Sequence, residues 1–531
     1  MTIAEKKPQR AISKTGSTGH KSVAWLRPIL LLGGITALWF VGLLLLQQLL
    51  DNGVSVLSSI GEYHSDDAQS ALGNLPEVVV AVLGIAITVV SIIVQLSATR
   101  YTPRVTEMFF GDRSNLIVLG FFVVTSIHCI WATFVVHSGF LPQVLIAATV
   151  LIMTVAILVL IPYFAYVFAF VEPQRIVSRL QAQALDDALA ATGSEDQQPR
   201  QRHVLASIEQ LADVAINSIS NKDRIIASRS VDALRDLARG YLIDKRRLSP
   251  SWFVVGGALK ENPDFTVMAE RSVEELSSGS AWLEFKILRQ YQMVFHDCLN
   301  RMRDVSQLVA INTRYIGQDA VELGDTAVAE LTIKFFNTYM RYAINARDVR
   351  TAYNVLHQYR QLAEALLRAT HVEQVRDIGQ YLKYYGQTAN AAGLPFVTET
   401  AAYDFCALCE LAHQLDSPAH DGLLATFLEV DKAPETEAEE RSLRGVRKAQ
   451  IKLATYYLAA GDESRARQIQ ADMAQEGAER LRSIRQELAS VVDRDFWEII
   501  DRGDNLEYLP QHRRAQLAVF FSWFGAHVNT D

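Results

Sequence analysis

The feature that most constrains the fold is a set of four long apolar runs in the first third of the chain. Each run has about the 20 residues that a helix needs to cross a hydrocarbon layer of roughly 30 Å. The runs cover residues 28–50, 77–98, 115–136 and 143–170. The first run exceeds the apolar core of a cleaved signal peptide and no clear cleavage site follows it, so we expect a permanent anchor. The four runs predict a four-helix transmembrane domain over residues 28–170.

Basic residues alternate between the two ends of these runs, which predicts the orientation of the chain. Residues 1–27 form a basic leader, and Arg100, Arg104 and Arg113 follow the second run. The loops at residues 51–76 and 137–142 contain no lysine or arginine. Because lysine and arginine concentrate in cytoplasmic loops, both termini are expected in the cytoplasm.

The rest of the chain is charged and amphipathic, and it is predicted to be almost wholly helical. Residues 171–203 are interpreted as a helix and a polar linker, and residues 204–531 as a helical cytoplasmic domain. The fold class is therefore mainly α. The pattern is looser at residues 248–266, where we expect a short hairpin or strand pair.

Two segments in this cytoplasmic part are similar to tetratricopeptide-type helical hairpins. Residues 342–356 align with residues 456–470, so that Asp348 matches Asp462. Stacked helical pairs form concave surfaces that bind proteins. An irregular α-solenoid and a plain helical bundle both remain open, because two matches do not establish a period.

Polar residues form a seam along the second apolar run. Gly84, Thr88, Ser91 and Gln95 recur at intervals of three or four residues and so share one helix face. His128 of the third run lies at a similar depth. One interpretation is a wet pathway for an ion or a proton, within one subunit or around an oligomer axis. The alternative is that these side chains only hydrogen-bond neighbouring helices to one another.

The segment between the second and third runs predicts a short helix that begins at Thr102 and Pro103 and ends at Gly111. Its apolar stripe would consist of Val105, Met108 and Phe109. We expect this helix to lie along the inner leaflet, with three arginines contacting lipid phosphates or a partner surface, namely Arg100, Arg104 and Arg113. The alternative is an ordinary basic turn that follows the charge rule.

The same region resembles a bacterial family of predicted membrane proteins of unknown function, domain of unknown function 2254. The resemblance rests on the motifs "VQLSATRYTPR" and "GDRSNLIVLGFF", and it covers roughly residues 76–240. The matching positions are Leu96, Ser97, Ala98, Tyr101, Thr102, Pro103, Arg104, Asp112, Arg113, Leu119 and Gly120. Asn221 and Asp223 stand where the family has Asn-Asp-Pro, but the proline is missing. The resemblance implies a multipass protein of the bacterial inner membrane and no particular activity.

The sequence argues against several functional classes. The formal net charge of −8 disfavours a nucleic-acid-binding protein. Cys406, Cys409 and His413 share a helix face that could supply three metal ligands, but core packing is the commoner reason for such a face. No motif indicates an enzyme, and no metal or cofactor is expected.

Two functions fit these observations. The first is an oligomeric pore for an ion or a proton, lined by the second and third helices and gated by the cytoplasmic helical domain. The second is a membrane-anchored scaffold or sensor, whose cytoplasmic domain binds a protein and which transports nothing. Both place the chain in a lipid bilayer, the first as a homo-oligomer and the second with a cytoplasmic protein partner.

Overall fold

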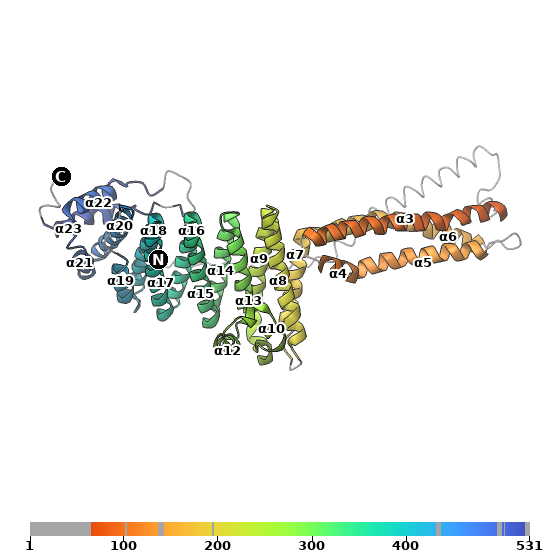
Figure 1. The fold of residues 1–531 in the computed structure, drawn as a ribbon, viewed down its shortest axis with the longest axis horizontal. Coiled ribbons are helices and arrows are strands. Elements are labelled where there is room, and N and C mark those ends of the chain that lie inside the picture. The colour runs from red at the N-terminus through yellow and green to blue at the C-terminus, as the bar shows by residue number, and fades with distance from the viewer. Residues whose placement is uncertain are drawn as a thin grey trace, which may run out of the picture. The chain divides into compact units, whose positions relative to one another are not determined.

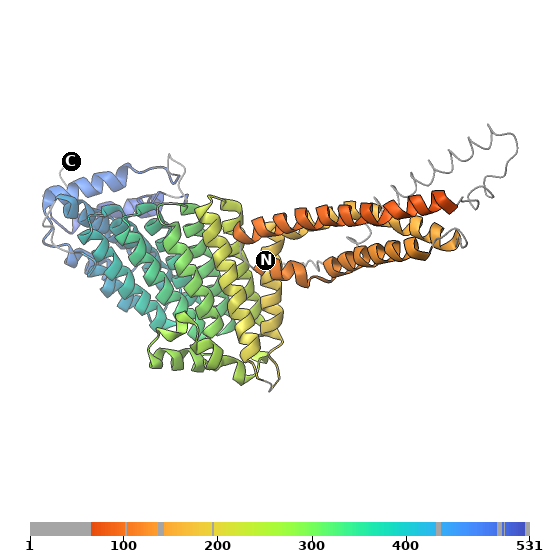
Figure 2. The ribbon, with the colours of Figure 1, turned by 45° about the vertical axis from the view of Figure 1, so that its right-hand side comes forward.

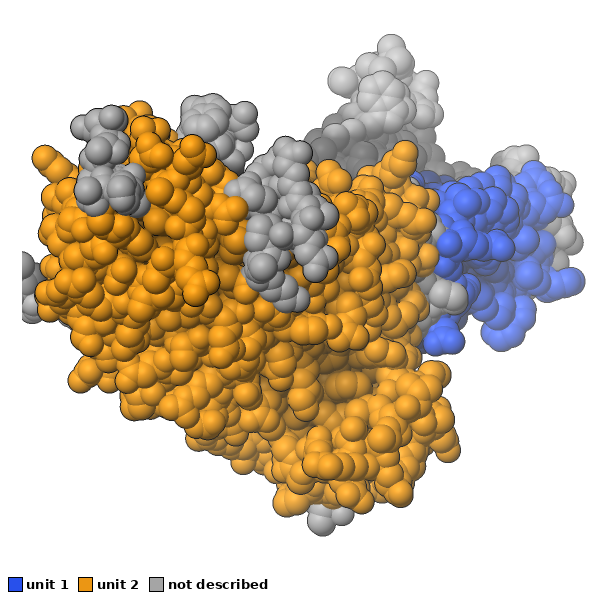
Figure 3. All heavy atoms as spheres, turned by 60° about the vertical axis from the view of Figure 1, so that its left-hand side comes forward, with its two compact units in different colours: residues 1–176 blue, residues 177–531 orange. Residues whose placement is uncertain are grey.

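The structure is a computed structural model that describes residues 65–100, 104–135, 143–193, 196–431, 437–495, 502–503 and 505–525. The chain divides into two compact units, unit 1 at residues 1–176 and unit 2 at residues 177–531 (Figure 3). The division falls within the segment at residues 171–203, which the sequence assigns to a helix and linker. Every regular element in the described part of the chain is a helix, so the mainly α fold class is confirmed.

Unit 1 contains helices that are long and apolar enough to cross a membrane. Its helices are α3 (Ser65–Arg100), α4 (Arg104–Gly111), α5 (Arg113–Val135) and α6 (Gln143–Val171). Three spans qualify in the described residues, at Glu77–Thr99, Arg113–Phe134 and Ala148–Val171. They correspond to the second, third and fourth apolar runs. The first run, at residues 28–50, lies outside the described residues. The structure therefore describes three of the four helices of the predicted bundle.

The three spans pack on one another through small and medium apolar side chains. Val79 of α3, Cys129 of α5 and Met153 of α6 form a buried cluster. By contrast, Ile85, Val124 and Leu151 are each more than 60% exposed. Large apolar side chains on outer faces are unfavourable in water but suit acyl chains. The burial pattern of unit 1 therefore fits a lipid environment.

Unit 2 is a long series of helices connected by short turns. In chain order they are α7 (Pro173–Leu189), α8 (Gln198–Ser220), α9 (Arg224–Asp244), η1 (Lys245–Arg247), η2 (Pro250–Phe253), α10 (Gly257–Lys260), α11 (Pro263–Thr266), α12 (Glu270–Ser278), α13 (Trp282–Cys298), α14 (Arg303–Leu323), α15 (Thr326–Asn345), α16 (Val349–Arg368), α17 (Val372–Ala391), α18 (Pro395–Gln414), α19 (His420–Leu428), α20 (Glu437–Ala460), α21 (Glu463–Asp472), α22 (Ala478–Ser490) and α23 (Gln511–Ser522). Helix α7 begins at the end of unit 1 and continues into unit 2.

The central helices of unit 2 lie side by side in two layers (Figures 1 and 2). One layer contains α8, α13, α15, α17 and α19, and the other contains α9, α14, α16, α18 and α20. Neighbouring helices within each layer contact each other, and most helices also contact a helix of the opposite layer that precedes or follows them in the chain. We call these two layers the helical array.

The turns of the helical array recur with a fixed spacing. Residues with a left-handed backbone occur every 23 residues, at Gly324, Arg347, Thr370, Gly393 and Asp416. After each of them, the next backbone N–H donates to the carbonyl oxygen five residues earlier, as Asp348 donates to Ala343 at 3.0 Å. This bond pattern is the Schellman motif, which satisfies carbonyl groups that the helix leaves unpaired. A 20-residue helix and a three-residue turn therefore form the repeating element.

Aspartates cap several of the helices that follow such turns. The carboxylates of Asp223, Asp325, Asp348 and Asp462 each accept a hydrogen bond from the backbone N–H three residues later, at 3.1–3.2 Å. Asp348 and Asp462 are the aspartates that the sequence alignment matches. They occupy equivalent turns because the same cap satisfies the same unpaired N–H group.

The strand pair expected at residues 248–266 is wrong, because this segment consists of helical turns. Pro250 and Pro263 each occupy the first turn of a short helix, where the missing N–H costs nothing. The Trp252 side chain is fully buried, and its indole N–H donates to the Tyr241 hydroxyl at 3.0 Å. The Trp252 carbonyl accepts from the Trp282 indole at 2.8 Å. The Trp252 carbonyl, which a strand ladder would use, is therefore satisfied by a side chain.

The capping role of Asp348 predicts a stability difference between two substitutions. Asp348→Ala removes the cap of α16 and should lower the free energy of unfolding by about 1 kcal/mol, whereas Asp348→Asn keeps a capping oxygen and should cost less. Chemical denaturation of the purified protein, followed by circular dichroism, measures both values. Asp377→Ala, an exposed position within α17, is the control. Equal losses for the two Asp348 variants would contradict the capping role.

Candidate functional site

The polar seam of α3 lies on the exposed face of that helix in the described structure. The buried face contains Val79, Ala86, Val90 and Val94, whereas Gly84, Thr88, Ser91 and Gln95 are all exposed. A Cβ atom added at Gly84 would meet no other atom within 4 Å. The Thr88 hydroxyl donates to the Gly84 carbonyl at 2.8 Å. The seam therefore faces away from α5 and α6, and its threonine is satisfied within its own helix.

His128 is held by a different partner. Its Nε2 atom lies 3.1 Å from the hydroxyl of Thr149, a buried residue of α6. The hydroxyl of Ser126 donates to the Phe122 carbonyl at 2.8 Å, within α5. Bonds of this kind join helices or satisfy hydroxyls within a membrane without any water. The structure brings His128 together with Thr149 and not with the seam.

Asn115 and Tyr163 form a polar contact inside unit 1 that the sequence interpretation missed. Asn115 is fully buried, and its amide nitrogen donates to the Phe109 carbonyl at 3.2 Å. Its amide oxygen accepts from the Tyr163 hydroxyl at 2.8 Å. Asn115 thereby joins α4, α5 and α6. The sequence feature that could have indicated this contact is an asparagine at the start of the third apolar run together with a tyrosine within the fourth.

The short helix α4 ends at Gly111, as predicted, but its apolar stripe packs on protein. Val105 and Phe109 are each 1% exposed, and the Phe109 ring meets the Phe170 ring edge-on at 5.3 Å. The stripe therefore covers other helices of unit 1, and the place of α4 along the inner leaflet stays a prediction. The stripe's third predicted member, Met108, is half-buried.

The three arginines expected to contact lipid flank this helix. Arg100 ends α3, Arg104 begins α4, and Arg113 begins α5. Arg113 is exposed, whereas the side chains of Arg100 and Arg104 lie outside the described part of the chain. The lipid contact of these arginines stays a prediction.

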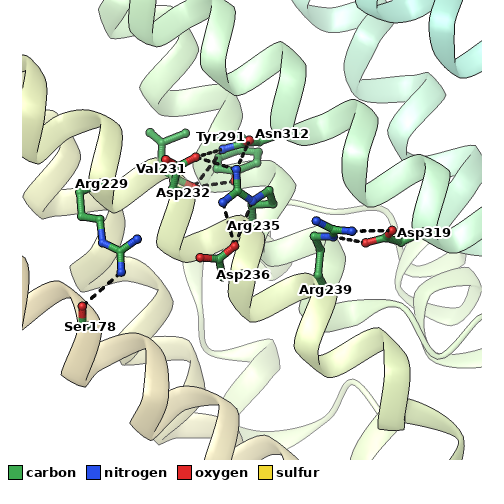
Figure 4. A network of polar contacts seen from close by, with 10 residues as sticks. All are labelled: Ser178, Arg229, Val231, Asp232, Arg235, Asp236, Arg239, Tyr291, Asn312 and Asp319. Carbon is green, nitrogen blue, oxygen red and sulfur yellow. Dashed lines mark hydrogen bonds and ion pairs between the residues drawn. The ribbon is translucent and has the colours of Figure 1, made fainter. Parts of the chain in front are cut away.

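A network of charged and polar side chains joins α9 to α14 in unit 2 (Figure 4). The Arg235 guanidinium lies 2.9 Å from Asp232, 2.8 Å from Asp236 and 3.1 Å from the Asn312 amide oxygen. One turn further along α9, Arg239 contacts Asp319 of α14 through two nitrogens. Every charge drawn in this network contacts a partner or another polar atom, so we interpret the network as structural.

Unit 2 also contains a large cavity with a charged wall. It has a volume of about 570 Å³ and is formed by α16, α18, α20 and the residues that follow α22. Its wall carries five cationic residues and two carboxylates. The cations are Arg360, Lys452, Arg494, Arg502 and Arg513, and the carboxylates are Asp404 and Glu410. We call this space the basic cavity.

The two carboxylates of the basic cavity each hold arginines in place. Both Asp404 oxygens accept from Arg502, at 2.6 and 3.1 Å, and one of them lies 3.0 Å from the Arg360 Nε atom. Both Glu410 oxygens accept from Arg513 at 2.9 Å. The Arg502 pair uses two guanidinium nitrogens, which fixes the plane of that group, whereas a single nitrogen of Arg513, Nη1, donates to both Glu410 oxygens. The cavity wall is therefore pre-organised.

The face that carries Cys406, Cys409 and His413 is a packing surface. Both thiols are buried, and burial is the main reason that their pKa values are raised, which disfavours the thiolate that a metal would bind. The described residues contain no group of histidines, cysteines and carboxylates that could hold a metal ion. His413 instead contacts the Tyr456 hydroxyl at 3.0 Å. The structure thus agrees with core packing.

The buried contact between Asn115 and Tyr163 predicts a loss of stability on Tyr163→Phe. This change leaves the Asn115 amide oxygen without its donor and should cost about 1 kcal/mol, a usual value for one hydrogen bond between membrane helices. Unfolding in mixed detergent micelles measures the difference. Thr154→Val is the control, because the Thr154 hydroxyl bonds a carbonyl of its own helix. A loss no larger than that of the control would show that the contact does not join the helices.

His420 predicts a dependence of stability on pH. Its ring nitrogen lies 2.6 Å from the Tyr457 hydroxyl, and burial, followed by Arg465 and His413, lowers its pKa to about 4. Since an unfolded histidine titrates near 6.5, the unfolded chain binds more protons between about pH 6.5 and 4. As the pH falls through this window, the free energy of unfolding should fall by up to about 3 kcal/mol for this residue. Chemical denaturation at a series of pH values measures the slope, which His420→Asn should reduce. An unchanged slope would exclude His420 as its source.

Comparison with known protein families finds a match to part of the chain. A family model described as a predicted membrane protein (DUF2254) matches residues 21–242. No curated protein and no solved structure matches the chain. The match confirms the resemblance seen in the sequence and extends it toward both ends. The chain therefore carries the domain of the predicted membrane protein family DUF2254 over residues 21–242.

Proposed function

We propose that the chain is a membrane-anchored binding protein of the bacterial inner membrane, with both termini in the cytoplasm. Unit 1 anchors the chain, and unit 2 acts as a scaffold or sensor that binds a ligand or a protein. The basic cavity carries this proposal, because it is large and charged and it lies wholly in unit 2. Concave sites with a few fixed polar groups are where proteins bind ligands.

The architecture of unit 2 supports a binding role. Its helices form two layers with turns every 23 residues, which we interpret as an α-solenoid. Stacked helical pairs of this kind present extended surfaces to protein partners. The array also supplies three walls of the basic cavity, namely α16, α18 and α20. A partner-binding surface and a ligand cavity can therefore share the same helices.

The described part of unit 1 supports the role of an anchor. Its crevice between α3, α5 and α6 has a volume of about 10 Å³ and is lined by Val78, Val79, Val82, Phe122, Met153, Ala156 and Ile157. A cavity needs roughly 10–15 Å³ and several polar partners to hold one water molecule. This crevice is too small and too apolar to conduct ions within one subunit.

A pore formed by several copies is the second candidate function. The seam of Gly84, Thr88, Ser91 and Gln95 lies on the outer face of α3, where it could line an axis between copies. In that arrangement unit 2 would gate the path. The two candidates differ in whether the purified protein conducts ions.

Ion flux through liposomes tests the proposal. We expect liposomes that contain the purified full-length protein to show the same K⁺ and H⁺ flux as empty liposomes, at any imposed voltage or pH gradient, because the crevice between α3, α5 and α6 is small and apolar. Thr88→Val and Ser91→Ala should then have no effect. A flux that these substitutions change, while the protein still assembles, would replace the anchor with a pore.

A further inference from the structure

We propose that the basic cavity binds a small anion that carries phosphate groups. The inference deepens the proposed function, since it names the ligand class that the cavity of unit 2 would accept. It rests on the charge of the wall, the donors that the wall leaves unsatisfied, and the size of the cavity.

The charge of the wall favours an anion. The wall contains five cationic side chains and two carboxylates, so its net charge is 5 − 2 = +3. Carboxylates already hold three of the five cationic side chains in place. These three are Arg360, Arg502 and Arg513. Arginine presents several N–H donors in a rigid plane that matches phosphate oxygens in pairs. A phosphate group can therefore bind without disturbing the ion pairs that position the arginines.

The wall also contains buried donors that have no partner in the described structure. The Arg502 side chain is 5% exposed, and its Nε atom is buried without a hydrogen-bond partner. The same is true of the Tyr403 hydroxyl. A buried donor without an acceptor is unfavourable, and most such groups in folded proteins are satisfied. Oxygens of a bound anion would supply the missing acceptors.

His357 reports the same positive environment. Burial is the main cause of its lowered pKa of about 4, and the nearby Arg502 and Arg360 guanidinium groups lower it further. At neutral pH the ring is therefore uncharged, and both of its nitrogens already have partners in the protein. Its contacts include Arg360 at 3.3 Å and Gln361 at 2.7 Å.

The size of the cavity sets the size of the ligand. A volume of about 570 Å³ lies within the roughly 300–1,000 Å³ of sites for small organic molecules. It exceeds what a single inorganic phosphate fills. We therefore infer an organic molecule with one or more phosphates, supplied either by a soluble metabolite or by a lipid headgroup.

Calorimetric titration with pyrophosphate tests the inference. Full-length protein in phosphate-free detergent buffer should bind pyrophosphate at one saturable site, more tightly than inorganic phosphate. Arg513→Gln and Lys452→Gln should each weaken binding at least tenfold, because each removes a positive charge from the wall. Lys452→Gln keeps a donor for the Leu506 carbonyl, which the lysine contacts at 2.7 Å, and so guards against a simple loss of folding.

Arg467→Gln is the matched control. Arg467 lies on α21, outside the basic cavity, and its guanidinium stacks over Trp523 at 3.7 Å. This variant removes the same charge and should bind pyrophosphate as the unchanged protein does. No measurable binding, or equal weakening in all three variants, would overturn the inference and show that the arginines only hold the residues after α22 in place.

The source of the phosphate is decided by repeating the titration in nanodiscs. If phosphatidylglycerol in place of phosphatidylcholine weakens pyrophosphate binding, a lipid headgroup competes for the cavity. If the two nanodiscs give the same affinity, the ligand is soluble. Either result supports the inference. A failure of pyrophosphate binding without ion flux overturns the ligand class alone, whereas flux overturns the proposed function.

Discussion

The cost of removing polar groups from water determines how this chain is organised. In the membrane unit, the Thr88 and Ser126 hydroxyls donate to carbonyls of their own helices, and the Tyr163 hydroxyl donates to the Asn115 amide oxygen of a neighbouring helix. In unit 2 even buried charges have partners. The Lys286 side chain is 1% exposed, and its ammonium lies 2.6 Å from Glu209 and 2.5 Å from Asp264. The basic cavity departs from this rule, because its wall holds more positive charge than negative charge.

The same constraint explains the regular spacing of the helical array. Each helix end leaves backbone carbonyls unpaired, and a left-handed residue lets the following N–H groups satisfy them. Gly324 and Gly393 adopt this conformation without strain, whereas Arg347, Thr370 and Asp416 adopt it at some cost. Because the turns from α14 to α18 recur at one spacing, helices of about the same length stack in two layers there. The walls of the basic cavity come from this stacking.

Much of the fold could be predicted from the sequence, because apolar length and helical periodicity are strong signals. The three described spans and the end of α4 at Gly111 agree with the structure. The 23-residue period could not be seen, since the residues at successive turns differ and only the backbone geometry repeats. The strand pair at residues 248–266 was wrong because tertiary contacts of Trp252 override a β-prone composition.

The basic cavity could not be predicted, because its residues come from positions far apart in the sequence. Arg360 lies on α16, Asp404 lies on α18, and Arg502 lies in the segment between α22 and α23, and no local motif connects them. The seam of α3, by contrast, follows directly from helical spacing. Spacing alone does not say what that face contacts.

The most direct test is a density map of the full-length protein in lipid nanodiscs. The anchor account predicts that the face of Gly84, Thr88, Ser91 and Gln95 packs against lipid or another helix, with no continuous line of water along it. A continuous water-filled path along that face, from one side of the bilayer to the other, would contradict the account.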